Sequence, residues 1–231
     1  MKKLLLCMLT GAVVGSFLMP LQASALSLQV NAGGGSVEGN VTDGGAGDGS
    51  GNAGVILFNQ AVNGGGSSWT VNITTGISYP AVGSPSQPYM DLNSVNIGSG
   101  TLRLVLSEQN FTNLSGFPFT GAIGGTAGNP GATVRYQTYW SATNNLFATD
   151  NLLTDSGSLG PGAFSNTRIG GGAGGAGPFS LTQVVTITHS GTRTSSFDAE
   201  LNVPEPASVL LLGLALVSLG VWGRRVLKAQ N

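Results

Sequence analysis

The sequence predicts an all-β antiparallel domain, sandwich-like or jelly-roll-like, with glycine-rich loops. We expect an N-terminal signal helix and a C-terminal transmembrane helix to flank it. Three observations predict this arrangement: period-two alternation of apolar and polar residues in several segments, glycine-rich segments between them, and an apolar segment at each end. Together they divide the chain into a signal peptide at 1–25, an exported β-rich domain at 26–202 and a C-terminal segment at 203–231.

Composition supports a folded domain of unusual character. Only 8% of the 231 residues are charged, 41% are hydrophobic, and 38 are glycine. Disordered chains usually combine low hydrophobicity with high net charge, whereas this chain has a formal net charge of −1. The glycines have no three-residue period, which excludes a collagen helix.

The first segment has the three parts of a secretory signal. Lys2 and Lys3 precede an apolar stretch at about 4–18, and Ala23 and Ala25 supply small residues at the cleavage positions. We expect cleavage after Ala25. An uncleaved N-terminal anchor is the alternative.

Cys7, the single cysteine, lies within the predicted signal. The exported domain is therefore expected to contain no disulfide, no thiolate metal site and no cysteine nucleophile. Burial and β-ladders must supply its stability.

Strand patterns dominate the central domain. The alternation is clear in 101–107, 132–140 and 196–203, where apolar residues occupy every second position. Weaker candidates are rich in Val, Ile, Thr and aromatic residues. They are 27–30, 54–62, 68–75, 89–97 and 181–189.

The segments between the strands are clusters of Gly, Ser, Asn and Pro, typical of turns and long loops. We expect the loops at 44–54 and 170–177 to be mobile, because glycine adds backbone freedom and buries nothing. A β-solenoid is the alternative architecture, but it needs a regular repeat, and the sequence has no fixed period.

Charge in the domain argues against nucleic-acid binding. Residues 26–202 contain nine acidic residues, four arginines and no lysine. A nucleic-acid-binding protein needs a basic surface, which this balance does not supply.

The sequence gives little support for catalysis. His189, the single histidine, has no nucleophile motif beside it. Asp198 and Glu200 lie on the same side of a predicted strand and could act in acid–base chemistry or bind a cation, but they are also typical of a solvated sheet face. We predict no catalytic residues, no cofactor and no metal site, and keep a hydrolase using Asp198 or Glu200 as an alternative.

Two other features could bind ligands. The stretch Asp43–Asn52 resembles a calcium loop, but Asn59 stands where the twelfth-position ligand would be Glu. A flexible acidic loop is therefore the favoured interpretation, and calcium binding is left as an open alternative.

Exposed aromatic residues could stack on sugar rings, although aromatic residues in strands are usually part of the core. The candidates are Trp69, Tyr79, Tyr89, Tyr136, Tyr139 and Trp140.

The C-terminal segment has three parts in order. Pro204, Glu205 and Pro206 form a stiff peptide without a full set of N–H donors. Residues 207–222 are uncharged, with a length of about 24 Å as a helix, somewhat short of a ~30 Å bilayer core. A basic cluster follows, which the positive-inside rule places in the cytoplasm. It consists of Arg224, Arg225 and Lys228.

This tripartite segment resembles the PEP-CTERM sorting signal of bacteria with an outer membrane. The resemblance implies recognition by an exosortase, a membrane-embedded enzyme, and processing at or near Pro204–Pro206. It also implies export with extracellular polysaccharide and biofilm machinery. It covers only the last twenty-nine residues and gives the central domain no ligand.

We therefore expect a non-enzymatic protein of the cell surface or extracellular matrix, first anchored in the inner membrane and then sorted outside. Its expected partners are an exosortase, the membrane and extracellular polysaccharide, with no nucleic acid. The alternatives are a secreted carbohydrate-binding module and a protein that keeps its C-terminal anchor.

Overall fold

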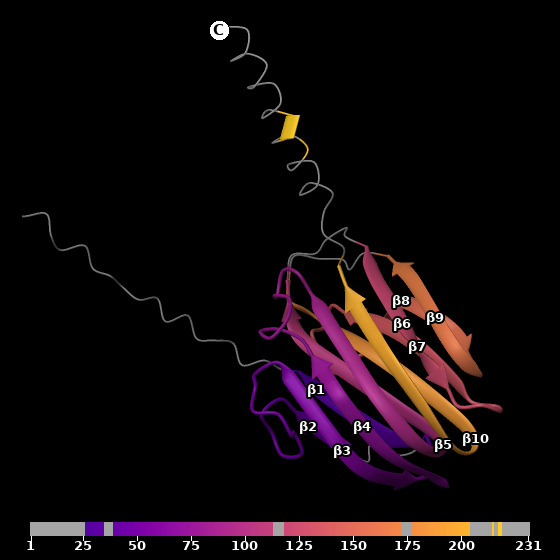
Figure 1. Cartoon of the computed structure of the whole chain (residues 1–231). Coiled ribbons are helices and arrows are strands. Elements are labelled where there is room, and N and C mark those ends of the chain that lie inside the picture. Colours follow the sequence, from indigo (N-terminus) through magenta and orange to yellow (C-terminus); the bar gives the residue numbers. More distant parts are fainter. Residues whose placement is uncertain are drawn as a thin grey trace, which may run out of the picture.

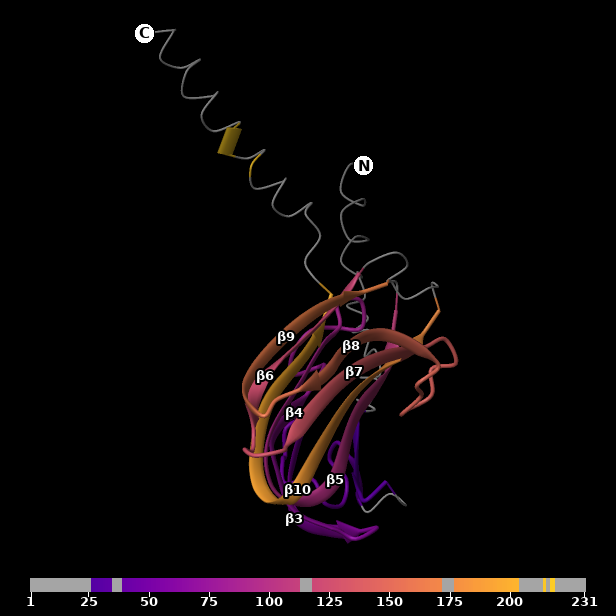
Figure 2. The ribbon, with the colours of Figure 1, turned by 90° about the vertical axis from the view of Figure 1, so that its right-hand side faces the viewer.

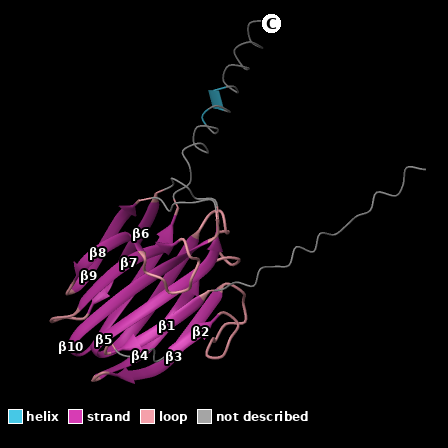
Figure 3. Cartoon of the chain, turned by 180° about the vertical axis from the view of Figure 1, so that it is seen from behind, coloured by secondary structure: helices cyan, strands magenta, loops and turns pink. Residues whose placement is uncertain are grey.

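The computed structural model describes residues 26–34, 39–112, 118–171, 177–203, 214, 217 and 218. Within these residues, ten antiparallel strands form one hydrogen-bonded sheet (Figures 1 and 3). The strands are β1 (Ser27–Ala32), β2 (Gly39–Thr42), β3 (Val55–Gly64), β4 (Ser67–Ile77), β5 (Tyr89–Phe111), β6 (Phe119–Ala127), β7 (Thr133–Ser141), β8 (Asn151–Leu159), β9 (Gly162–Gly170) and β10 (Phe179–Asn202).

Two long neighbouring strands, β5 and β10, fold this sheet into two layers. Each bends near its middle, and their ladder shifts register between His189 and Arg193, opposite 98–100 of β5. Figure 2 shows the two layers side by side, joined where these strands bend. The result is a sandwich-like fold in which the same two strands belong to both layers.

The partners of each half-strand define the layers. The first layer runs in the order β3, β4, the first half of β5, the second half of β10, β6 and β9. The second layer runs in the order β2, β1, the second half of β5, the first half of β10, β7 and β8. Each layer thus has six strands: the two shared strands in the centre and two further strands on each side of them.

Glycine makes the bend in β5 possible. A Cβ on Gly98 would lie 2.3 Å from the carbonyl oxygen of Ser68 and 2.5 Å from the ring of Trp69. Gly100 has a φ of +85°, a conformation that L side chains rarely adopt. The two glycines therefore let β5 bend against β4 where any side chain would obstruct it.

The core lies between the layers and follows the predicted alternation. Leu102, Leu104 and Leu106 are fully buried on β5, and Phe197, Ala199 and Leu201 are buried on β10. The residues between 197 and 201 face outward, as period two requires.

The loop between β7 and β8 covers part of the outer face of the second layer. The Phe147 N–H donates to Ser107 Oγ at 2.9 Å, and Ser180 Oγ donates to the Asn145 carbonyl at 2.6 Å. This cover explains why Ser107 and Ser180 are buried although they face away from the core.

The all-β antiparallel prediction is confirmed. β2, β6, β8 and β9 were not predicted, and the pairs of short strands predicted at 89–97 with 101–107 and at 181–189 with 196–203 are each one continuous strand. The predicted signal peptide lies outside the described residues, as does nearly all of the predicted transmembrane helix. In the part of the chain that the structure describes, no helix has the length and apolar character needed to cross a membrane.

Candidate functional site

Three carboxyl groups gather on the outer face of the first layer. Asp198 and Glu200 share a side of β10, as predicted, and the strand register places Asp91 of β5 directly opposite Glu200. We call these three residues the acidic cluster. Sequence reasoning missed Asp91, because its position depends on a pairing between strands more than one hundred residues apart.

The acidic cluster holds a proton near neutral pH. Partial burial raises the pKa of Asp91 to about 7, and the charge of Asp198, a hydrogen bond with the same carboxyl group and the charge of Glu200 add to the rise. Close carboxylates repel each other when both are ionised, so one retains its proton. Below about pH 7 the Asp91 carboxyl group therefore retains its proton and can donate a hydrogen bond.

Tyr89 and Asn202 extend the cluster toward one end of the layer. They are paired across β5 and β10, and the Asn202 side-chain amide donates to Glu200 Oε1. Burial raises the pKa of Tyr89 to about 12, and the neighbouring charges of Glu200 and Asp91 contribute. The phenol therefore remains protonated and can donate a hydrogen bond.

An open pocket adjoins this end of the cluster. Its lining residues come from the loop before β5 and from the end of β10. They are Val82, Gly83, Gln87, Pro88, Tyr89, Asn202 and Val203. Tyr89 and Asn202 connect the pocket with the acidic cluster, so the two features form one surface of apolar, amide, phenol and carboxyl groups.

The loop that resembled a calcium site uses its carboxylates internally. Asp43 Oδ2 accepts from the Gly54 N–H at 2.8 Å, and Asp48 accepts from the N–H groups of Gly44, Ser50 and Leu57 at 2.8–3.0 Å. These bonds hold a loop that was expected to be mobile. Among the described residues, no three His, Cys, Asp or Glu side chains are grouped so that they could hold a metal ion.

His189 is buried at the bend, where both of its ring nitrogens have hydrogen-bond partners within the protein. Its Nδ1 lies 2.8 Å from the Gly98 carbonyl oxygen, and its Nε2 lies 2.7 Å from Ser195 Oγ. Ser195 Oγ also accepts from the Gly128 N–H at 3.0 Å. Burial lowers the pKa of His189, so the imidazole is neutral at physiological pH. Through Gly98 and Ser195 it connects β5 with the parts of β10 on either side of the bend.

Three of the six aromatic candidates are buried in the core. Trp69, Tyr79 and Tyr136 are buried, and the Trp69 ring lies against His189 with centroids 4.6 Å apart. Tyr89, Tyr139 and Trp140 are partly exposed. Of these, Tyr89 borders the acidic cluster and the pocket.

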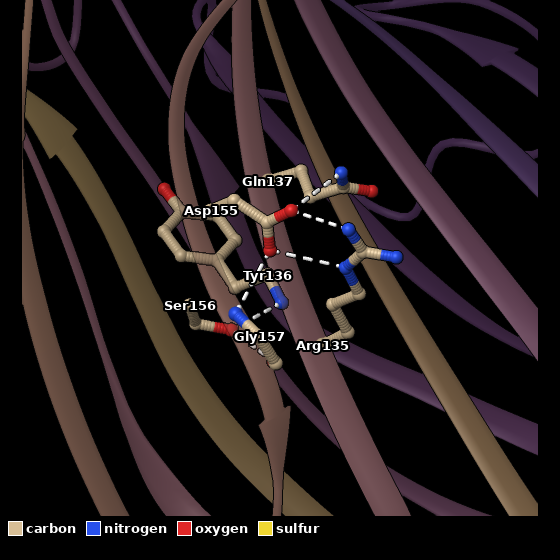
Figure 4. Close-up of polar contacts among 6 residues, drawn as sticks. All are labelled: Arg135, Tyr136, Gln137, Asp155, Ser156 and Gly157. Atoms are coloured by element: carbon tan, nitrogen blue, oxygen red, sulfur yellow. Dashed lines mark hydrogen bonds and ion pairs between the residues drawn. The ribbon is translucent and has the colours of Figure 1, made fainter.

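The outer face of the second layer carries an ion pair instead of an acidic cluster (Figure 4). Arg135 Nε donates to Asp155 Oδ1 at 3.0 Å, and Gln137 Nε2 donates to Asp155 Oδ2 at 3.1 Å. The hydrogen bond from Arg135 is the main cause of the lowered pKa of Asp155. The Asp155 carboxylate is therefore occupied by hydrogen bonds from Arg135 and Gln137.

The predicted sorting and cleavage residues lie outside the described residues. They are Ala23, Ala25, Pro204, Glu205, Pro206, Arg224, Arg225 and Lys228. The structure does place the end of β10 at Asn202, two residues before Pro204. The C-terminal segment therefore follows directly from a central strand of the fold.

Comparison with solved structures gives distant similarities. The enzymatically active domain of tailspike protein 4 of bacteriophage CBA120 is 10% identical over 58% of this chain, with a TM-score of 0.32. The adhesin domain of Epf from Streptococcus pyogenes is 10% identical over 78%, with a TM-score of 0.40. The K1 cleaved adhesin domain of Lys-gingipain from Porphyromonas gingivalis W83 is 11% identical over 66%, with a TM-score of 0.34.

This chain matches 19%, 60% and 97% of those three chains, respectively, so it spans about a fifth of the first and three fifths of the second. No curated protein matches the sequence.

The C-terminal segment, by contrast, matches a known family model. The model describes the PEP-CTERM protein-sorting motif and matches residues 202–225. The match includes the predicted Pro204–Pro206 peptide, the apolar stretch and Arg224 and Arg225. The chain thus carries a PEP-CTERM protein-sorting motif, which marks it as an exported protein sorted by an exosortase and displayed outside.

Proposed function

We propose that the chain is a non-enzymatic protein of the cell surface or extracellular matrix that binds extracellular polysaccharide after an exosortase has processed it. The observation that carries the proposal is the sorting motif at 202–225. The motif begins where β10 ends, so processing at Pro204–Pro206 would release the β domain without cutting any described strand.

The chemistry of the acidic cluster supports a binding role over a hydrolytic one. Retaining glycosidases place two carboxyl groups about 5–5.5 Å apart and inverting ones about 6.5–9.5 Å apart, leaving room for the reacting bond or water. The adjoining pocket is lined by Tyr89 and Asn202 and by none of Asp91, Asp198 and Glu200, so no two of these carboxyl groups flank it. The proposal therefore gives the cluster no catalytic role.

The same surface suits a polysaccharide ligand. Sugar hydroxyls both donate and accept hydrogen bonds, and the cluster with Tyr89 and Asn202 supplies both kinds of partner. Tyr89 adds a partly exposed ring beside an open pocket, where an apolar sugar face could pack. On the opposite layer, Arg135, Gln137 and Asp155 form an ion-pair cluster without an adjoining pocket residue among those that line the opening beside Tyr89.

The sorting step is tested by mass spectrometry of the mature C-terminus in the native host. Wild-type protein should lack Asn231, whereas the double variant Pro204→Ala/Pro206→Ala should accumulate as a membrane-associated precursor that ends at Asn231. Pro178→Ala, in the loop before β10, is the matched control and should be processed normally. Intact Asn231 on every wild-type molecule would refute processing and support a permanent anchor.

The binding step is tested with polysaccharide isolated from the producing organism. Tyr89→Ala and Glu200→Gln should each weaken binding at least tenfold, because each removes a direct partner from the proposed surface. Thr188→Ala, exposed at the bend, is the control and should bind as wild type. Absence of binding by the wild-type protein would refute the polysaccharide ligand and leave the sorting proposal intact.

A further inference from the structure

The edges of the two layers differ in how open they are to another strand. An edge strand exposes unpaired N–H and C=O groups, and natural proteins usually block such edges with short strands, charges, bulges or loops. Among the described edge strands, β2 is short, β3 and β8 have register shifts against their neighbours, and β9 pairs over nine residues without one.

Each of the other edges has its own protection. β2 is four residues long. β8 pairs with β7 through two register shifts and carries Asp155. β3 has a register shift between Ile56 and Phe58, and the loop before it pairs with Leu57 at the same place: the Gly49 N–H donates to the Leu57 carbonyl at 2.8 Å and the Leu57 N–H donates to Asp48 Oδ1 at 3.0 Å.

β9 is regular, long and nearly uncharged. All nine residues pair with β6 without a register shift, and Arg168 is the single charged residue of the strand. The strand forms the rim of the molecule at the right of Figure 1. Its outward side chains are small or polar except for Ile169, which is 73% exposed.

We propose that β9 is a self-association edge, where it pairs antiparallel with β9 of a second copy about a two-fold axis. A two-fold axis makes an edge complementary to itself, and two-fold dimers are the commonest homo-oligomers. Pairing would join the two first layers into one continuous sheet of twelve strands, six from each copy. The inference is independent of the polysaccharide proposal.

The residues of β9 fit this pairing with its centre at Asn166. Gly162 then lies opposite Gly170 of the second copy, and Ile169 lies opposite Ala163, which shields part of the exposed Ile169 side chain. Arg168 lies opposite Phe164, where a guanidinium can contact an aromatic ring. The two arginines are about 14 Å apart along the strands, beyond the screening length at physiological salt.

The other edges explain why assembly would stop at two. Among the described edges, β9 is the long one without a register shift, and two-fold pairing uses this edge of both copies. A head-to-tail arrangement would need β3 as the second edge, and the Asp48 loop covers part of it.

Sedimentation velocity on the full chain in detergent tests the pairing. The wild type should sediment with twice the monomer mass, and Ser165→Lys/Thr167→Lys should sediment as a monomer. In the proposed register each new lysine faces a lysine of the other copy. The matched control is Asn59→Lys/Ala61→Lys, which adds the same charges to exposed positions of β3 and should remain dimeric.

Cysteine cross-linking tests the register in a Cys7→Ser background. Asn166→Cys should form an intermolecular disulfide, because opposed Cα atoms in an antiparallel pair are about 4.5–5.5 Å apart. Ala163→Cys should not, because its two copies would be about 20 Å apart along the strands. A monomeric wild type, or a dimer that survives the β9 lysines, would overturn the proposal. Cross-linking at 163 but not at 166 would overturn the register.

Discussion

Asp91 of β5 lies directly opposite Glu200 of β10 on the outer face of the first layer, and the pKa of Asp91 is raised to about 7. Partial burial is the main cause of this rise, and the charges of Asp198 and Glu200 add to it, so repulsion between carboxylates is built into the middle of the sheet. Ionisation of Asp91 therefore acts against folding, with effects that can be measured.

Asp91→Asn should stabilise the protein at alkaline pH. The folded-state pKa of Asp91 is above its ordinary value of 3.8, so its favourable contribution is complete below pH 3.8 and is lost as the pH rises through about 7. The variant should exceed the wild-type free energy of unfolding by about 2 kcal/mol at pH 8, after allowing for solvent screening, and match it near pH 4. Urea denaturation at both pH values measures the difference; equal gains at both would contradict the titration argument.

Arg135→Gln should have the opposite pH dependence. Arg135 lowers the pKa of Asp155, so the contribution of this carboxylate is present above pH 3.8 and is lost as the pH falls through the lower folded-state pKa. Because the pair is partly exposed, we expect a loss of about 0.5–1 kcal/mol at pH 7 that disappears near pH 2. Asn59→Ala, at an exposed position of β3, serves as the control, and a pH-independent loss in Arg135→Gln would argue against the ion pair.

Ser195→Ala should destabilise the bend. It removes the partner of His189 Nε2 and of the Gly128 N–H, both near the point where the layers join. Unmet buried polar groups cost about 1–3 kcal/mol each, so we expect a loss of at least ~1 kcal/mol at pH 8. Ser190→Ala, which is exposed, should change the unfolding free energy by less than ~0.5 kcal/mol.

His189 gives the bend its own pH response. The lowered folded-state pKa means that the neutral imidazole contributes stability above pH 6.5, and this stability is lost as the pH falls from 6.5 toward the folded-state pKa. His189→Gln should remove that part of the pH dependence while lowering stability throughout. An unchanged slope between pH 7 and 5 would show that the imidazole does not titrate with folding.

Gly98→Ala should be among the most damaging single substitutions in β5. The added methyl would lie within 2.5 Å of the Trp69 ring and 2.3 Å of the Ser68 carbonyl, so the bend would have to open. Overpacking of this kind costs about 1–3 kcal/mol or more. Gly51→Ala, whose Cβ would meet open space, is the matched control, and thermal denaturation of both variants distinguishes a local clash from a general effect of alanine.

Local patterns predicted the strands that alternate strongly and missed those that do not. Leu102, Leu104 and Leu106 give a clear period of two, whereas β6 contains Gly121, Gly124 and Gly125, and β9 has few large apolar residues and no regular alternation. A glycine-rich strand resembles a loop in sequence because its stability comes from neighbouring strands. The same reasoning failed at 98–100, where two glycines bend a continuous strand.

The candidate site was only half predictable. The shared face of Asp198 and Glu200 follows from sequence spacing alone, but the addition of Asp91 and Tyr89 requires the register between β5 and β10. The role of His189 likewise depends on Gly98, Gly128 and Ser195, which meet only when the strands bend. The sorting motif was predictable in full, because a linear signal depends on residue order.

The position of β10 also determines how the domain would respond to mechanical force. This strand leads into the C-terminal segment and is held by ladders to β5, β6 and β7. A pull on that end would load several ladders in shear at once, whereas an edge strand would peel away one bond at a time. A protein tethered through this end could therefore resist drag on its surroundings with its central strand as the tension-bearing element.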